Sequence, residues 1–307
     1  MTDTHTPTSE DAQSPEERRK LARRTVLAAS SVAVTAVGVG SAFAATDGTT
    51  VSKEDTAAAS ASASEGACYT LTSELVEGPY YIDADKLRQD VTEDQEGIPL
   101  LLTLKVIDAE TCKPLRNAAV DIWHCNASGI YSGYEEMGSG GGGGTPPTGE
   151  PPTDAPTGTP TGPPPGGGGG HQDPTDDTRY LRGTWHTDRH GHVTFRTVFP
   201  GWYQGRCVHI HVKVHVDGEW TDAGYEGGHT CHTGQLFFDE KSVLLSAEVE
   251  PYASNTTTRT TLDEDTIYPD NGHAGGLLYL KYDRHHIARG VRGHLTLGVE
   301  PDETNNG

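Results

Sequence analysis

Apolar side chains recur at every second position in four segments of the chain, residues 102–106, 118–122, 193–199 and 208–216. Successive side chains of a β-strand point to opposite faces, so this period predicts strands with one buried face. Turn signals separate the segments, and no long stretch has the 3.6-residue period of an amphipathic helix. The pattern therefore predicts an all-β fold, an antiparallel β-sandwich with long loops.

The first 44 residues have a different pattern. Basic residues, including the pair Arg23-Arg24 before Thr25-Val26-Leu27, precede a weakly apolar run that ends in Ala42-Phe43-Ala44. A basic region, an apolar region and a small-residue cleavage site together indicate a signal peptide, here of the twin-arginine type. We therefore expect export by the twin-arginine machinery and a secreted product. The alternative is an uncleaved membrane anchor, which the many Ala, Ser, Thr and Gly residues disfavour.

Two further segments are predicted not to belong to the packed core. Residues 45–66 are small and polar and are expected to form a flexible linker. Residues 138–170 consist almost entirely of Gly, Pro, Thr and Ser, a composition that buries too little apolar area to offset the entropy of ordering. We interpret this tract as a disordered insertion within one catalytic domain, residues 67–307, because motifs on both its sides belong to one candidate site.

Charge and cysteine content restrict the function classes. The chain has 23 Lys and Arg against 44 Asp and Glu, a formal net charge of -21, which argues against nucleic acid as a partner. Its five cysteines include no C-x-x-C pair, so a zinc ribbon or a thioredoxin motif is not expected. Export would favour disulfides, of which five cysteines allow at most two within the chain. The sequence does not say which cysteines pair.

The sharpest chemical signal is a His-x-His pair in the strand predicted over residues 208–216. His209 and His211 point to the same side of that strand and can converge on one metal ion. His215 lies too far along the strand for the same ion and is interpreted as a surface or supporting residue. A carboxylate at the spacing of a cupin-type site is missing, since the first acidic residues are Asp217 and Glu219.

Two tyrosines supply the other candidate ligands. Tyr203 precedes the histidine pair in a glycine-rich turn, and Tyr131 follows the predicted strand at residues 118–122. Phenolate is a hard anionic donor, and a free tyrosine has a pKa near 10, so only a strongly charged ion holds it ionised at neutral pH. Two phenolates with two imidazoles suit ferric iron better than zinc or copper.

These residues lie in segments that resemble the intradiol ring-cleavage dioxygenases, particularly their exported bacterial and fungal branch. The resemblance spans about residues 68–300 apart from the Gly/Pro-rich tract. It rests on the following segments: Glu77-Gly78-Pro79-Tyr80-Tyr81, Val120 to Asn126 with Gly129-Ile130-Tyr131-Ser132, Phe195 to Tyr203, Arg206 to His211, and Thr233-Gly234-Gln235-Leu236-Phe237-Phe238.

The resemblance implies an Fe(III) enzyme that opens a catechol-type ring between its two hydroxyl-bearing carbons with O2, giving a muconate-type product. The implied iron ligands are Tyr131, Tyr203, His209 and His211. Tyr203 would also help to accept a substrate proton. Arg206 and Gln235 are implied to stabilise charge that develops on the substrate. The short spacing from Tyr203 to His209 differs from the catechol-specific branch, which carries a long insertion there.

Two other functions are considered. Residues 101–120 also fit a prealbumin-like β-sandwich used as a non-catalytic binding or cell-wall module, in which the two histidines would be incidental. A zinc hydrolase is a weaker alternative, because no carboxylate ligand stands at a familiar spacing. The joint presence of both tyrosines, both histidines, Arg206 and Gln235 favours the enzyme, built on the same prealbumin-like core.

Overall fold

A computed structural model describes residues 50–51, 68–83, 86–138, 172–268 and 275–305 of the chain. The predicted signal peptide, the linker apart from residues 50–51, and the insertion beyond Gly138 lie outside these residues. The strands are β1 (Thr50–Val51), β2 (Pro99–Asp108), β3 (Ala119–Trp123), β4 (Arg182–His186), β5 (His192–Val198), β6 (His209–Trp220), β7 (Tyr225–Phe237), β8 (Tyr279–Tyr282) and β9 (Val291–Val299).

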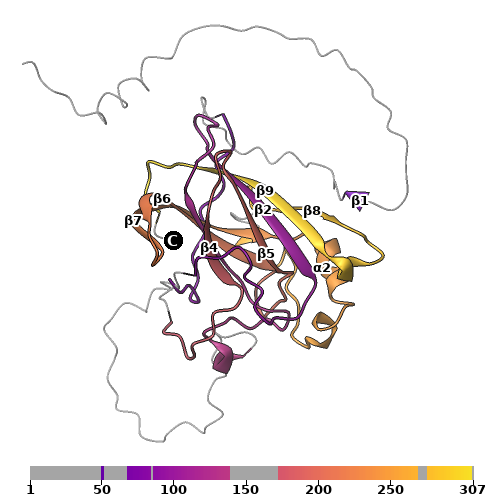
Figure 1. Ribbon diagram of the computed structural model, residues 1–307. Helices are drawn as coiled ribbons and strands as arrows, with labels where there is room; N and C mark the ends of the chain where they lie inside the picture. Colours follow the sequence, from indigo (N-terminus) through magenta and orange to yellow (C-terminus); the bar gives the residue numbers. More distant parts are fainter. Residues whose placement is uncertain (1–49, 52–67, 84–85, 139–171, 269–274, 306–307) are drawn as a thin grey trace, which may run out of the picture. The chain divides into compact units, whose positions relative to one another are not determined.

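The strands form two sheets. One has the order β1-β8-β9-β2-β5 and the other the order β4-β3-β6-β7. Figure 1 shows β2, β5 and β9 side by side, with β6 and β7 at the other side of the view. All strand pairs are antiparallel except β2 and β9, which run parallel. The structure thus confirms the predicted all-β fold and adds one parallel pair to it.

The core lies between the two sheets and follows the predicted alternation. Leu102 and Leu104 of β2 are fully buried, as are Ile210 and Val212 of β6, and all four belong to one apolar cluster. Burying a side chain of this size contributes about 1.5–3 kcal/mol. Because β6 fills the core with its even-numbered residues, His209 and the other odd-numbered residues at its start face away from the core.

That second face of the four-stranded sheet is also covered. Leu75 donates a backbone hydrogen bond to Thr233 of the edge strand β7 (2.9 Å), and three residues later Gly78 lies against the His211 ring, so the segment before β2 covers this face. His209 and His211 are therefore buried although they point away from the main core. The fold thus buries two imidazoles between the sheet and the segment that covers it, outside the main apolar core.

Helical structure is short. Helix α2 (Glu240–Ser246) begins at Asp239, whose side chain accepts a hydrogen bond from the Ser242 amide and so caps the first turn. The 3-10 turns are η1 (Glu135–Met137), η2 (Tyr252–Ser254) and η4 (Ile287–Arg289). No helix among the described residues is long and apolar enough to cross a membrane.

The cysteines form one disulfide among the described residues. Cys68 and Cys112, which are 44 positions apart, are joined, and the bond ties the start of the folded region to the turn after β2. Cys125, Cys207 and Cys231 are buried free thiols. Burial raises the pKa of Cys231 to about 12, so this thiol stays protonated and unreactive.

Candidate active site

Two histidines at the start of β6 turn their rings toward each other. The Nε2 atoms of His209 and His211 lie 3.1 Å apart. Nδ1 of His209 lies 2.7 Å from the carbonyl oxygen of Cys207. A carbonyl oxygen only accepts hydrogen bonds, so this nitrogen carries the proton and Nε2 keeps a free lone pair. His209 therefore presents the tautomer that binds a metal through Nε2.

Burial keeps both imidazoles neutral. It lowers the pKa of His209 to about 3, and the nearby Arg206 guanidinium adds to this effect. It also lowers the pKa of His211 well below the ordinary value, with His209 contributing further. Neutral imidazole is the form that binds metals, so neither ring has to lose a proton to a metal near neutral pH.

Two tyrosines approach this pair from separate loops. The hydroxyl of Tyr131, in the loop after β3, lies 3.5 Å from Nε2 of His209. The hydroxyl of Tyr203, between β5 and β6, lies 3.3 Å from the same atom. Burial raises the pKa of both phenols, so without a cation they stay protonated at neutral pH. A bound multivalent cation would reverse this preference by stabilising the phenolates.

The donor set fits ferric iron. Two imidazole nitrogens and two phenol oxygens converge, and as phenolates the latter would balance two of the three charges of Fe(III). Among the residues that the structure describes, no group of three or more His, Cys, Asp or Glu side chains could hold a metal ion. The described part of the chain thus offers no ligand cluster of the kind a zinc hydrolase uses.

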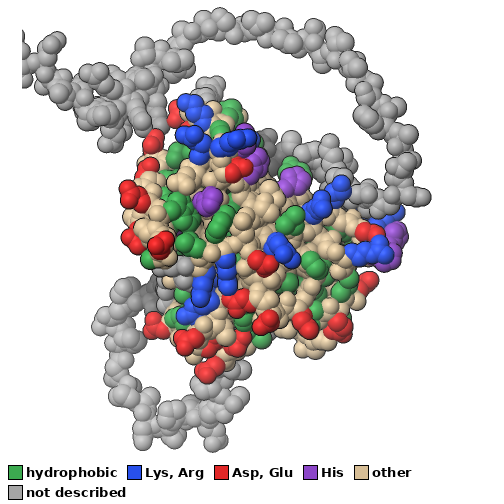
Figure 2. Space-filling view, in the orientation of Figure 1, with side chains coloured by type: hydrophobic (Ala, Val, Ile, Leu, Met, Phe, Trp, Pro, Cys, Tyr) green, Lys and Arg blue, Asp and Glu red, His purple; other side chains and the backbone are tan. Residues whose placement is uncertain are grey.

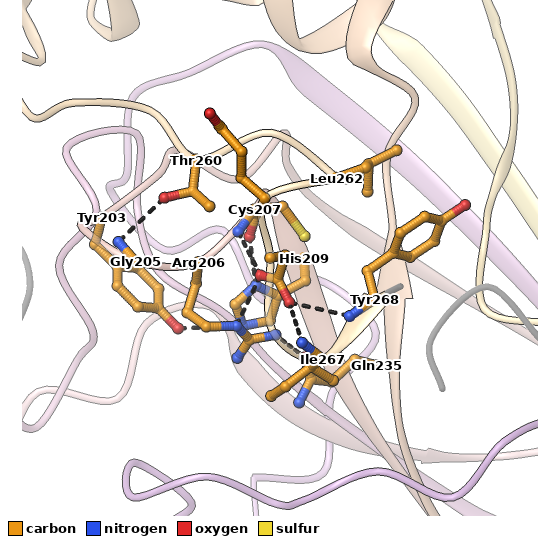
Figure 3. A network of polar contacts seen from close by, with 12 residues as sticks. Tyr203, Gly205, Arg206, Cys207, His209, Gln235, Thr260, Leu262, Ile267 and Tyr268 are labelled. Carbon is orange, nitrogen blue, oxygen red and sulfur yellow. Dashed lines mark hydrogen bonds and ion pairs between the residues drawn. The ribbon is translucent and has the colours of Figure 1, made fainter. Parts of the chain in front are cut away.

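A guanidinium stands beside these four side chains. Arg206 precedes β6, and Gly205 before it has a φ of 87°, which bends the chain away from strand geometry. Nη2 of Arg206 donates to Oε1 of Gln235 (2.5 Å), and Nε2 of Gln235 donates to the carbonyl of Val76 (3.0 Å). Both ends of the Gln235 amide are therefore engaged. Figure 3 shows Tyr203, Arg206, His209 and Gln235 gathered in one polar network.

The segment from Glu77 to Tyr81 closes another side of the site. Gly78 packs so tightly on His211 that an added Cβ would lie 3.2 Å from its Cε1, and its φ of 81° favours glycine. The Tyr80 ring packs on the Tyr131 ring with centroids 4.9 Å apart. The structure thus brings this segment against both a histidine and a tyrosine of the cluster.

Known dioxygenases match the chain in sequence and in structure. A family model described as Dioxygenase matches residues 76–140. Catechol 1,2-dioxygenase of Acinetobacter baylyi is 38% identical over 72 residues, which span 22% of this chain and 23% of that enzyme. The solved intradiol ring-cleavage dioxygenase from Tetranychus urticae is 31% identical with a TM-score of 0.60, over 77% of this chain and 98% of that one. The chain belongs to the intradiol ring-cleavage dioxygenases.

Membership in this family decides between the functions that the sequence left open. A prealbumin-like sandwich that serves only as a binding or cell-wall module is set aside in favour of an intradiol ring-cleavage dioxygenase. All six residues predicted for the site lie in the cluster described above: Tyr131, Tyr203, Arg206, His209, His211 and Gln235. His215 does not reach it. Its Nδ1 lies 3.0 Å from the Thr230 hydroxyl, and the ring lines a separate cavity of about 570 Å³.

Asp265 holds the guanidinium of Arg206, a contact that sequence reasoning missed. One of its oxygens accepts from Nε of Arg206 (2.9 Å) and from the amide of Cys207 (2.7 Å). Its other oxygen accepts from the amides of Ile267 and Tyr268, two residues that are labelled in Figure 3. Asp265 stands in a run of acidic residues and threonines that looks like solvated surface, so nothing in the sequence marked it.

Arg182 was missed as well. This buried residue of β4 donates from Nε to the Ser132 hydroxyl, from Nη2 to the Ser132 carbonyl (both 2.8 Å) and from Nη1 to the Tyr80 carbonyl (2.7 Å). Burial lowers its pKa to about 10, so it remains cationic at neutral pH. Arg182 therefore ties the loop that carries Tyr131 to the segment that carries Tyr80.

Trp123 supports the second histidine from β3. Its ring stacks on His211 with centroids 4.8 Å apart and an interplanar angle of 10°. The neighbouring His124 points elsewhere, since its Nε2 lies 2.7 Å from the Thr197 hydroxyl and its Nδ1 lies 2.8 Å from the Cys125 carbonyl. His124 thus has a structural role, and Trp123 fixes the plane of the imidazole that faces the site.

Proposed function

We propose that this dioxygenase is an exported Fe(III) enzyme that cleaves a catechol-type ring between its two hydroxyl-bearing carbons. The observation that carries the proposal is the convergence of Tyr131, Tyr203, His209 and His211. The relative from Acinetobacter baylyi is named for catechol, which supports this substrate class. Both atoms of O2 would enter the product, a muconate-type dicarboxylate, as the carbon–carbon bond breaks.

The protein's own residues would bind and deprotonate the substrate. When bound, ferric iron would supply the Lewis acidity and the redox chemistry that make a catechol reactive toward O2. Tyr203 is only partly buried, and its hydroxyl oxygen, ionised in the loaded site, would accept a hydroxyl proton from the substrate. Trp123, Tyr80 and Gly78 pack around the ligands and exclude water.

Arg206 and Gln235 would stabilise the negative charge that the ring gains during the reaction. Nη2 of Arg206 donates to Gln235, while Nε is held by Asp265, so the guanidinium has a fixed orientation beside Tyr203. A donor fixed in advance needs no reorganisation when charge develops, and removing one typically lowers kcat by about 100-fold or more. The neutral Gln235 amide is expected to contribute less than the charged guanidinium.

An optical spectrum with metal analysis tests the iron assignment. Tyrosinate bound to ferric iron absorbs visible light, so the purified protein should be red to burgundy with one iron per chain. Adding catechol should shift the band, and oxygen uptake should match the ring-opened product one to one. A colourless protein that contains stoichiometric zinc and takes up no oxygen would disprove the proposal.

Export is proposed from residues 1–44, which lie outside the described residues. The paired arginines before an apolar run and a small-residue cleavage site support a twin-arginine signal. In a host with this machinery, the full chain should reach the medium cleaved after Ala44. Replacing Arg23 and Arg24 by lysine should retain it in the cell. A product that stays in the membrane fraction with residues 1–44 attached would instead identify an anchor.

A further inference from the structure

The outward face of the five-stranded sheet carries cations in an otherwise acidic protein. Along β2, β5, β8 and β9, every second residue is buried in the core and the residues between them face outward. All charged side chains at these outward positions are basic: Lys105, Arg196, Lys281 and Arg292. We call these four residues the basic face.

Figure 2 shows the same segregation of charge. In the orientation in which β2 and β9 are nearest, Lys, Arg and His side chains spread across this side of the molecule. Asp and Glu side chains crowd mainly along the left and lower margins of the view. The chain as a whole has 44 acidic against 23 basic residues, so outward strand positions whose charged side chains are all basic depart from its average. One of the four, Arg196, pairs with Asp90 from the segment before β2 (3.4 Å), which leaves Lys105, Lys281 and Arg292 without a carboxylate partner among the described residues.

Two of these cations lie directly opposite each other. Lys281 of β8 is the cross-strand partner of Arg292 of β9 in an antiparallel pair. Like charges in this position repel and destabilise a sheet. Neither side chain pairs with a carboxylate among the described residues, although both are exposed. The described residues therefore offer this pair no compensating charge, whereas an anionic ligand would contact both cations at once.

A groove of about 410 Å³ runs beside this pair. Its lining includes Leu101, Lys281, Arg292 and Arg289. The groove also contains one carboxylate, Asp283, but Nη1 of Arg289 lies 3.6 Å from it, and His286 lies 3.1 Å from the same oxygen. Asp283 thus pairs with Arg289 and His286, whereas Lys281 and Arg292 remain available to a ligand.

An exposed aromatic ring continues the surface. Tyr279 precedes Lys281 by two residues on the same face of β8, and 63% of its area is exposed. It stacks on His294 of β9 with ring centroids 5.4 Å apart and an interplanar angle of 20°. Flat aromatic rings at a protein surface pack against the C–H faces of sugars. A ring beside two cations therefore suits a sugar that carries an anionic group.

The dimensions favour an extended ligand over a compact one. Lys105 stands four residues from Leu101, whose neighbour on β9 is Arg292, so these cations are separated by about 13 Å along the strands. Salt at physiological strength screens exposed charges beyond about 8 Å. The acidic remainder of the molecule is therefore largely screened from a ligand that lies on the basic face. The carboxylates within the screening distance repel duplex DNA more strongly than a polymer with one charge per sugar, because DNA carries one charge per roughly 1.7 Å.

We propose that the basic face is a docking surface for an anionic polysaccharide, a polymer with about one carboxylate per sugar. Lys281 and Arg292 bind its carboxylates, Tyr279 packs on a sugar ring, and Lys105 and Arg196 extend the contact. This surface lies outside the residues assigned to ring cleavage. It would hold the dioxygenase on a polymer while the active site remains open to small catechols.

Affinity electrophoresis of the full exported protein in gels with polygalacturonate tests the proposal. We expect retardation at low salt that fades as salt rises, and no retardation with neutral dextran. The double variant Lys281→Glu/Arg292→Glu should bind at least tenfold more weakly. Lys241→Glu with a second exposed change, Lys113→Glu, gives the matched control, which should keep both its affinity and the activity of the parent.

A single substitution separates docking from fold stability. Lys281→Glu places opposite charges across the β8–β9 pair, so it should raise the thermal midpoint while it lowers affinity for polygalacturonate. Lys281→Arg should preserve binding. The proposal is overturned if the parent protein shows no salt-sensitive retardation, if the double variant binds like the parent, or if duplex DNA or polyphosphate binds more tightly than polygalacturonate. None of these readouts depends on iron or on ring cleavage.

Discussion

A single buried carboxylate sets the orientation of Arg206, the arginine proposed to act in the site. Asp265 is 1% exposed and accepts hydrogen bonds from Arg206, Cys207, Ile267 and Tyr268. Arg206 is long and flexible, and holding it in one rotamer requires partners at more than one nitrogen. Asp265 supplies one of them and Gln235 the other. We therefore assign Asp265 as a positioning residue that acts through the guanidinium.

Replacing Asp265 by Asn should separate positioning from metal binding. The amide keeps the shape but loses the charge that orients Arg206, so kcat should fall roughly 10- to 100-fold. The four proposed iron ligands are untouched, so colour and iron content should remain. Steady-state kinetics and an absorption spectrum of the same sample check both points. Asp263→Asn, two residues away and exposed, should leave both unchanged, and an equal loss in that variant would contradict the assignment.

The same carboxylate gives a pH-dependent contribution to stability. Although burial alone would raise its pKa, Arg206 and the Cys207 amide lower it from 3.8 to about 2. Because the pKa is lower in the folded protein than in the unfolded chain, the ionised carboxylate stabilises the fold at pH values above the unfolded pKa. This stabilisation is lost as the pH falls through the folded pKa. The unfolding free energies of parent and Asp265→Asn should therefore differ most above about pH 5. Urea titrations at pH 6 and pH 3 should show the gap shrinking, and a constant gap would argue against the ion pair.

Changes to individual ligands should have different signatures. Tyr203→Phe removes a phenol oxygen, so the visible band should change and turnover should nearly vanish while the histidine pair remains. His209→Ala removes the nitrogen that lies within 3.5 Å of all three other ligand atoms, so iron should be lost altogether. Metal analysis beside the spectrum distinguishes the two cases. Full iron content in His209→Ala would remove that residue from the ligand set.

At the scale of elements, the site depends on how closely the segment before β2 approaches β6. Gly78 is the point of contact, since its backbone lies against the edge of the His211 ring. On the other side, Trp123 stacks on that ring. The imidazole is thus held between a backbone and an indole. Its plane depends on the absence of a side chain at residue 78.

Gly78→Ala tests this contact against backbone strain alone. The new Cβ would press on His211, and the left-handed φ of 81° adds about 1–2 kcal/mol of strain. Iron affinity should fall roughly 10- to 100-fold. Gly227 has a similar φ of 72°, but an added Cβ there would meet nothing within 4 Å. The Gly227→Ala variant should therefore have the same backbone strain and retain its iron. Equal iron affinity in the two variants would show that the contact does not matter.

The strands could be predicted from the sequence because alternation is a local signal. The predicted segment at residues 102–106 lies in β2, and that at 208–216 lies almost entirely in β6. The bend that brings Arg206 to the site was predictable from Gly205 for the same reason. Asp265 was not, because it acts on a residue 59 positions earlier and resembles its exposed neighbours. Arg182 was hidden likewise, since the atoms that it binds are mostly backbone carbonyls, which every residue has.

At the scale of the whole molecule, the two ends of the Gly/Pro-rich tract are held near each other. On one side of the tract, Tyr134 precedes the 3-10 turn η1 and Gly138 follows it. The Tyr134 hydroxyl donates a hydrogen bond to the carbonyl of Gln172 (2.8 Å), which lies just beyond the other end of the tract. Replacing residues 139–171 by about ten residues should therefore retain the fold and the iron. Loop-closure entropy changes by only about 0.6 kcal/mol per doubling of length, so stability should rise by about 1 kcal/mol. Denaturant titration measures this, and an unfolded product would show that the tract supports the core.

The parallel pairing of β2 with β9 also restricts when the protein can fold. The strand that begins at Pro99 must wait for the strand that ends at Val299, because β9 lies between β2 and β8 in the finished sheet. A ribosome adding about 5–20 residues per second needs roughly 10–40 s to pass from β2 to β9. During synthesis the edge of β2 that will pair with β9 keeps its backbone donors and acceptors unpaired within the sheet. The strand that completes the five-stranded sheet is thus also the last one in the described part of the chain.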